Sequence, residues 1–191
     1  MKDNSIRIAN CSGFYGDKLS IARDMIEGGP IDVLTGDYLA ELTMTILYNQ
    51  KLKRGEEHGY VGTFLKQFKD VAKLAQEKDI KIVTNAGGLN PSSMASAVKE
   101  IVQELNLDLK VAYIEGDDLM PRIDELYKGG ETLTNIDKAL DLQNYKKKPI
   151  TANAYLGAWG IKEALDNGAD VVICPRVTDA AVVIGPAAWK Y

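Results

Sequence analysis

Short runs of β-branched and apolar residues alternate along the chain with longer segments in which apolar residues recur every three or four positions. The short runs predict strands at 6–10, 31–34, 80–83, 109–114, 150–155 and 170–174. The periodic segments between them predict helices, of which 61–78 has the clearest apolar stripe. Strands that alternate with helices are typical of crossover units. The pattern therefore predicts an α/β fold, with a mostly parallel sheet flanked by helices in a Rossmann-like three-layer arrangement.

Nearly every predicted strand ends in small, polar or acidic residues. In an open parallel sheet, ligands bind at the carboxyl ends of the strands, where such side chains would meet along one edge. The sequence therefore predicts a cleft at that edge. The side chains that would line it are Ser12, Thr35, Asp37, Asn85, Glu115, Asp117, Asn153, Arg176 and Asp179.

The glycine-rich stretch 84–93 lies between a predicted strand and a predicted helix. Asn90 is placed as the helix N-cap and Pro91 as the first helical residue. Gly87 and Gly88 would let backbone N–H groups approach an anion, and Ser92 lies in the first turn of the helix. The stretch lacks the lysine of a Walker A loop and the G-x-G-x-x-G spacing of dinucleotide sites. A capped turn without any ligand is the alternative.

The acidic strand-end residues allow two interpretations. Asp37, Glu115 and Asp179 are candidate acid/base residues, because a carboxylate in a dry cleft can have its pKa raised into a useful range. Together with Asp117 and Asp118, they could instead supply oxygen ligands to Mg²⁺. Helix capping is the competing interpretation for Asp37, Asp118 and Asp179, each of which precedes a helical pattern.

Arg176 follows the last predicted strand, where its planar guanidinium could bind a carboxylate or a phosphate. An ion pair with Asp179 is the equal alternative. The predicted ligand contacts also include Ser12 and Gly13 in the turn after the first strand, Asn153 in the 150–155 strand, and Thr178 in the same strand-end segment as Arg176. Cys11 is a weak candidate nucleophile. A lone histidine, His58, argues against a histidine-rich metal site and a Ser-His-Asp triad.

Composition narrows the function classes. The formal net charge is −4, which gives no broad cationic face and argues against nucleic acid as a partner. Two cysteines far apart make no disulfide framework. No apolar run approaches the roughly 18 residues of a membrane span, and no signal peptide is apparent, so a cytoplasmic protein is expected.

Five short motifs resemble the acyclic terpene utilisation AtuA-like family: Ile8–Phe14, Leu34–Glu41, Asn85–Pro91, Asn153–Gly157 and Arg176–Ala181. The resemblance implies a place in the breakdown of branched acyl-CoA compounds, near carboxylases, hydratases and lyases. It supplies no set of catalytic residues. Members of the family are longer, so residues 1–191 are predicted to form a single α/β domain in the amino-terminal part of a longer protein.

These observations favour an enzyme, or half of one, that acts on an acyl-CoA-type or other anionic metabolite, with lyase or hydratase chemistry as one option. No cofactor is predicted beyond the Mg²⁺ option. The first alternative is a non-catalytic binding or assembly module, such as a homo-oligomer, that uses an exposed patch with Trp189 and Tyr191. The second is a nucleotide-binding Rossmann-like protein.

Overall fold

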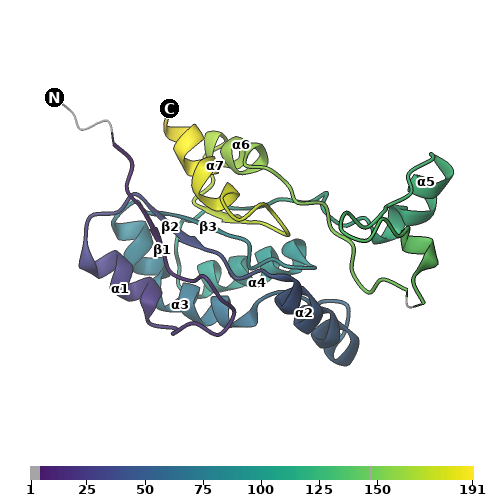
Figure 1. Ribbon diagram of the computed structural model, residues 1–191. Helices are drawn as coiled ribbons and strands as arrows, with labels where there is room; N and C mark the ends of the chain where they lie inside the picture. Colours follow the sequence, from purple (N-terminus) through teal and green to yellow (C-terminus); the bar gives the residue numbers. More distant parts are fainter. Residues whose placement is uncertain (1–4, 147) are drawn as a thin grey trace.

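A computed structural model describes residues 5–146 and 148–191. Within these residues, five parallel strands form one sheet in the order β1-β2-β3-β5-β4 (Figure 1). The strands are β1 (Ile8–Asn10), β2 (Val33–Gly36), β3 (Lys81–Thr84), β4 (Val111–Tyr113) and β5 (Val171–Ile173). The predicted α/β fold with a parallel sheet flanked by helices is confirmed.

The helices follow the periodic segments of the sequence, with shifts of a few residues at their ends. They are α1 (Ile21–Gly28), α2 (Glu41–Arg54), α3 (Gly62–Glu77), α4 (Pro91–Glu104), α5 (Ile123–Lys128), α6 (Trp159–Asp166) and α7 (Ala181–Lys190). Short 3-10 turns occupy Met120–Arg122 and Leu142–Asn144. In the described part of the chain, no helix combines the length and apolar character needed to cross a membrane.

The alternation of side chains along each strand creates a core on each face of the sheet. On one face, Leu34 and Ile82 are buried together with residues of α1, α3 and α4. On the other face, Val33, Val83 and Val172 are buried with residues of α6 and α7. Because the central strands are covered on both faces, they read in the sequence as continuous apolar runs.

The connections that follow β3 and β5 run to opposite faces of the sheet. These strands are hydrogen-bonded neighbours. The chain leaves β3 toward α4 on one face and leaves β5 toward α7 on the other. Chains that diverge in this way mark the point at which parallel α/β sheets bind ligands. Asn85 and Arg176 follow these two strands.

The strand predicted at 150–155 is wrong. Residues 150–156, called the strap below, form an extended segment that lies across the strand ends and pairs only through the isolated bridges Asp118↔Asn153 and Leu156↔Val177. The Ala154 N–H donates to Asp117 O at 2.7 Å, and the Leu156 N–H donates to Arg176 O at 3.2 Å. The backbone N–H groups of the strap are therefore hydrogen-bonded to the loops after β4 and β5, and not to a neighbouring strand.

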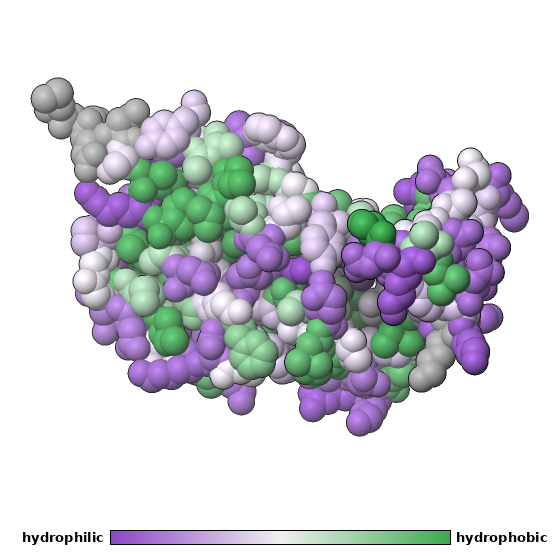
Figure 2. All heavy atoms as spheres, viewed as in Figure 1, coloured by the Kyte–Doolittle hydropathy of each residue, from purple (hydrophilic) through white to green (hydrophobic). Residues whose placement is uncertain are grey.

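The polar, weakly patterned sequence of residues 129–149 predicts an excursion that covers a site. Together with α5 they project from the body of the protein, and the outline is indented between the two (Figures 1 and 2). Leu142, Tyr145 and Pro149 of this projection line two cavities within it, one of them together with α5. Met120 and Ile150, which flank the projection, line the cavity that is called the apolar cavity below. Lys147, the middle residue of the three consecutive lysines at 146–148, lies outside the described residues.

Candidate functional site

Arg176 is the central charged residue at the strand ends. It is only 5% exposed, although guanidinium groups are seldom buried without a partner. Its Nη1 donates to the backbone carbonyl of Leu39 at 2.8 Å. The guanidinium carbon lies 4.1 Å from the ring centroid of Tyr155. One carbonyl and one aromatic face therefore fix the orientation of the guanidinium.

The two carboxylates near Arg176 make only long contacts with its guanidinium. Asp179 Oδ1 is 3.5 Å from Nη1, and Glu41 Oε1 is 3.7 Å from Nη2. Their side chains are 78% and 82% exposed, whereas that of Arg176 is 6% exposed. The Tyr155 hydroxyl donates to Glu41, and this hydrogen bond lowers the pKa of Glu41. The predicted ion pair of Arg176 with Asp179 is present, but long exposed contacts of this kind contribute little stability.

Asp37 and Asn85 form a pair next to Arg176. Asn85 is fully buried, and its side-chain oxygen accepts the Tyr38 N–H at 2.7 Å while its Nδ2 donates to Asp37. Burial raises the pKa of Asp37, and the Asp179 carboxylate raises it further, against the opposing effects of Asn85 and Arg176. The capping interpretation of Asp37 is wrong, because α2 begins only at Glu41 and has no side-chain cap.

Asp117 ties the strap to the end of β5. Its Oδ2 accepts from Asn153 Nδ2 at 2.8 Å and from the Arg176 N–H at 3.1 Å, and the residue is only 4% exposed. Burial is the main cause of its raised pKa. Asn153, predicted as a ligand contact, is therefore held by a carboxylate, and Asp117 fixes the backbone of both Arg176 and the strap.

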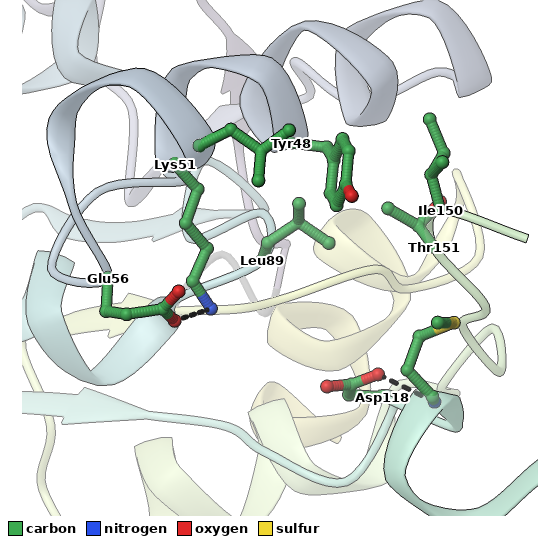
Figure 3. A pocket seen from close by; sticks show the side chains of 9 residues that line it. Tyr48, Lys51, Glu56, Leu89, Asp118, Ile150 and Thr151 are labelled. Atoms are coloured by element: carbon green, nitrogen blue, oxygen red, sulfur yellow. Dashed lines mark hydrogen bonds and ion pairs between the residues drawn. The ribbon is translucent and has the colours of Figure 1, made fainter.

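Two adjoining cavities lie between α2 and the strap. The polar cavity has a volume of about 210 Å³ and is lined by Glu41, Met44, Thr45, Thr151, Asn153, Tyr155 and Arg176. The apolar cavity has a volume of about 220 Å³ and is lined by Tyr48, Lys51, Leu52, Glu56, Leu89, Asp118, Met120, Ile150 and Thr151 (Figure 3). Thr151 lines both cavities.

The glycine-rich stretch 84–93 uses its own backbone donors within the protein. Each N–H from residue 86 to residue 90 has a partner: Thr84 Oγ1, Cys174 O, Asn85 O, Gly59 O and Gly87 O, in chain order. Asn90 caps α4 as predicted, because its side chain accepts the Ser93 N–H at 3.1 Å. Ser92 donates to Asn90. The contribution of this stretch to a cavity is the side chain of Leu89.

The turn after β1 is filled by a carboxylate of the same chain. Asp17 Oδ2 accepts the N–H groups of Gly13 and Phe14 at 2.8 and 3.0 Å. Ser12 Oγ donates to the Phe14 carbonyl, and Ser12 O accepts the Asp37 N–H at 2.8 Å. Ser12 and Gly13 therefore support the position of Asp37, and the donors of this turn are already in use.

Other predicted residues lie apart from the two cavities. Glu115 is exposed at the end of β4, and Thr178 is exposed, with its N–H bound to the strap at Leu156 O. Asp179 does not cap α7, which begins at Ala181 without a side-chain cap. Among the described residues, no three or more histidine, cysteine, aspartate or glutamate side chains are arranged to hold a metal ion, so the Mg²⁺ hypothesis gains no ligand set.

The cysteines and the histidine contribute little to the strand-end chemistry. Burial raises the pKa of the Cys11 thiol to about 11, which disfavours a thiolate nucleophile. Cys174 is fully buried, and its pKa is raised by burial as well. His58 Nδ1 lies 3.3 Å from Glu57 Oε1, and the imidazole ring stacks on the ring of Tyr60. His58 lines neither of the two cavities.

Replacing Asp37 with asparagine is expected to stabilise the protein at neutral pH. The raised pKa means that the folded state holds the proton more tightly than the unfolded chain does. Ionisation of Asp37 therefore lowers stability as the pH rises from the unfolded pKa, about 3.9, through the folded pKa. Asparagine removes that cost and keeps an oxygen that can accept from Asn85.

Urea unfolding of wild type and Asp37→Asn across the acid-to-neutral range measures the effect. The gain in the variant should be present at neutral pH and should vanish below the unfolded pKa, where the wild-type carboxyl is protonated in both states. A difference that does not change with pH would contradict the assigned cause.

Sequence reasoning missed several residues that line the cavities. Glu41, Tyr48, Lys51 and Leu52 are part of a helical pattern that was interpreted only through its apolar positions Leu39, Leu42 and Ile46. Tyr155 lies in a segment predicted as a strand. A usable signal was present in α2: Glu41, Met44, Thr45, Tyr48, Lys51 and Leu52 share one face at helical spacing.

Comparison with known proteins identifies the family. A family model described as acyclic terpene utilisation family protein AtuA matches residues 6–191. Searches of curated proteins and of solved structures gave no match. The match covers almost the whole chain and includes the strand ends, the strap and α2. The chain therefore belongs to the acyclic terpene utilisation AtuA family.

Proposed function

We propose that the polar cavity is the active site of an enzyme that acts on an acyl-CoA-type or other anionic metabolite in acyclic terpene catabolism. The observation that carries the proposal is the state of Arg176, a buried guanidinium that lines a cavity and whose carboxylate partners are exposed and 3.5–3.7 Å away. An anionic or carbonyl group of a substrate can displace those partners at low cost, because they return to water.

The neighbouring groups supply acid/base chemistry. Asp37 interacts with both Arg176 and Asp179, and its pKa is raised by burial. A carboxyl group with a raised pKa transfers protons more effectively near neutral pH than an ordinary aspartate does. Asp37 does not line the polar cavity, but it lies within electrostatic range of Arg176, which does. We therefore assign Asp37 as the acid/base residue, and Arg176 and Tyr155 as the groups that bind and orient the anionic end. Hydration or lyase chemistry needs such a proton transfer beside an activated carbonyl group.

The test is the affinity for small carboxylates and CoA thioesters, measured by calorimetry. Arg176→Lys keeps the charge but loses the planar fork, and it is expected to weaken binding about tenfold or more. Glu41→Gln and Asp179→Asn remove the competing carboxylates and are expected to tighten binding. A neutral amide of the same size serves as the control ligand and should respond to none of these changes.

The opposite directions of these effects separate ligand binding from a structural role. If the guanidinium serves only to hold Leu39 and Tyr155, the loss of Glu41 or Asp179 charge cannot tighten binding. Unchanged affinity in Arg176→Lys together with unchanged affinity in Glu41→Gln would overturn the proposal.

A second candidate function, an assembly module, is favoured by the surface of α6 and α7. Trp159, Ile184 and Tyr191 are 73%, 52% and 74% exposed, whereas Trp189 packs in part against the core under these helices. Figure 2 shows apolar side chains gathered on this side of the molecule. Sedimentation velocity distinguishes the candidates, because a protein that stays monomeric at high concentration would contradict self-assembly through this surface.

A further inference from the structure

The apolar cavity is built by four parts of the chain. Tyr48, Lys51 and Leu52 come from α2, with Glu56 shortly after it, and Leu89 comes from the glycine-rich stretch. Asp118 and Met120 come from the segment before α5, and Ile150 and Thr151 come from the strap. In Figure 3, Leu89 and Tyr48 lie next to each other, and Ile150 and Thr151 approach from the opposite side. The residues that face one another are therefore mostly apolar.

Large apolar side chains stay exposed around this cavity. Leu52 is 66% exposed, Ile150 is 43% exposed and Met120 is 37% exposed. Each of them is on a different element, yet all three line the same hollow. Apolar side chains that gather around a concave surface without being covered are typical of a ligand groove.

The one cation that lines the apolar cavity is paired. Lys51 Nζ lies 2.9 Å from Glu56 Oε2 (Figure 3). Asp118 is exposed and keeps its negative charge, and its Oδ1 accepts the Met120 N–H at 2.9 Å. The described lining of the cavity thus offers no unpaired cation to an anionic group. A hydrocarbon group complements such a lining better than a phosphate or a nucleobase does, because it can be buried without a hydrogen-bond partner.

The apolar cavity and the polar cavity are neighbours along α2. Thr151 lines both, and residues on one face of α2 line both. That face begins at Glu41, near Arg176, and ends at Leu52, eleven residues further along the helix. At 1.5 Å per residue this distance is about 16 Å. The polar cavity lies at the Glu41 end of this face, and the apolar cavity lies at the Leu52 end.

We propose that the apolar cavity binds the hydrocarbon chain of an amphipathic carboxylate or acyl thioester whose head group lies at Arg176. Leu52 and Ile150 then act as the specificity residues that select chain length. This inference rests on the proposed function for the position of the head group. The chain site itself rests on the lining, the exposure and the paired lysine of the apolar cavity.

The experiment is a chain-length series of straight-chain carboxylates, from butyrate to tetradecanoate, titrated calorimetrically into the wild-type protein and variants. Each added methylene is expected to tighten binding about two- to fourfold until the cavity is filled. Leu52→Asp and Ile150→Asp are expected to flatten this dependence and to leave butyrate affinity unchanged. Leu42→Asp is the matched control, because Leu42 is also on α2, is 62% exposed and lines neither cavity.

Four results decide the matter. A chain-length dependence that survives in both aspartate variants, or that is lost equally in Leu42→Asp, would overturn the chain site. Binding that needs Arg176 but ignores chain length would overturn it too, and would leave the proposed function standing. A chain-length dependence that Leu52→Asp flattens, but Arg176→Lys does not affect, would support the chain site and contradict the proposed function. Absence of binding throughout the series would overturn both.

Discussion

Replacing Gly87 with alanine is expected to lower the free energy of unfolding by about 3 kcal/mol. A Cβ atom at Gly87 would lie 2.6 Å from the carbonyl oxygen of Cys174 and 2.8 Å from Pro91 Cβ. The same carbonyl accepts the Gly87 N–H at 3.1 Å, so the loop cannot withdraw without breaking that hydrogen bond. Because the contact is with backbone at the end of β5, no side-chain rotation relieves it.

Gly13→Ala is the matched control. Gly13 also follows a strand, but a Cβ there meets nothing within 4 Å. Its substitution is expected to change stability by no more than about 0.5 kcal/mol. Urea unfolding of the two variants compares them directly, and equal effects would mean that close packing against β5 is not the reason for a glycine at 87. The same packing explains why a larger residue at Gly87 would be a poor probe of ligand binding.

Truncation of Arg176 to alanine is expected to cost about 3 kcal/mol of stability. The variant loses a hydrogen bond from a charged donor to the Leu39 carbonyl, worth about 1.5–3 kcal/mol. It also loses the contact with the Tyr155 ring, worth about 0.5–2 kcal/mol. Leu39 lies two residues before α2 and Tyr155 lies in the strap, so the loss should loosen both of these segments.

Glu41→Gln and Asp179→Asn are expected to behave differently from Arg176→Ala. Both carboxylates are exposed and distant from the guanidinium, so each change should alter stability by about 0.5 kcal/mol or less. Thermal and urea unfolding measure all three variants under the same conditions. If either carboxylate variant lost as much stability as Arg176→Ala, the guanidinium would be a structural ion-pair partner, and its availability to a ligand would be disproved.

The local pattern of the sequence was sufficient for the architecture. Burial of a strand on both faces demands a continuous apolar run, and burial of one helix face demands apolar residues at helical spacing. Both patterns depend only on residues that are close together in the sequence. The ends of β3 and α3 were therefore predicted to within a few residues. The cap at Asn90 is local in the same sense, because its side chain bonds to an N–H only three residues away.

The chemistry at the strand ends depends on partners that no local pattern reveals. Asp37 had the sequence context of a helix cap, yet its carboxylate binds Asn85, which is 48 residues away. The Tyr155 hydroxyl donates to Glu41, which is 114 residues away in the sequence. Tyr155 lies in the strap, whose sequence resembles a strand but which does not join the sheet.

The sequence by itself determined the parallel α/β sheet and the polar character of the edge where its strands end. Only the tertiary structure decided which donors at that edge are already used and which cavity is left open. Asp17 fills the turn after β1, and the protein's own acceptors bind the N–H groups of 86–90. Arg176 alone among the predicted ligand contacts is a buried charge with weakly held partners. The reason is physical: hydrogen-bond satisfaction depends on distances between segments that the chain brings together only when it folds.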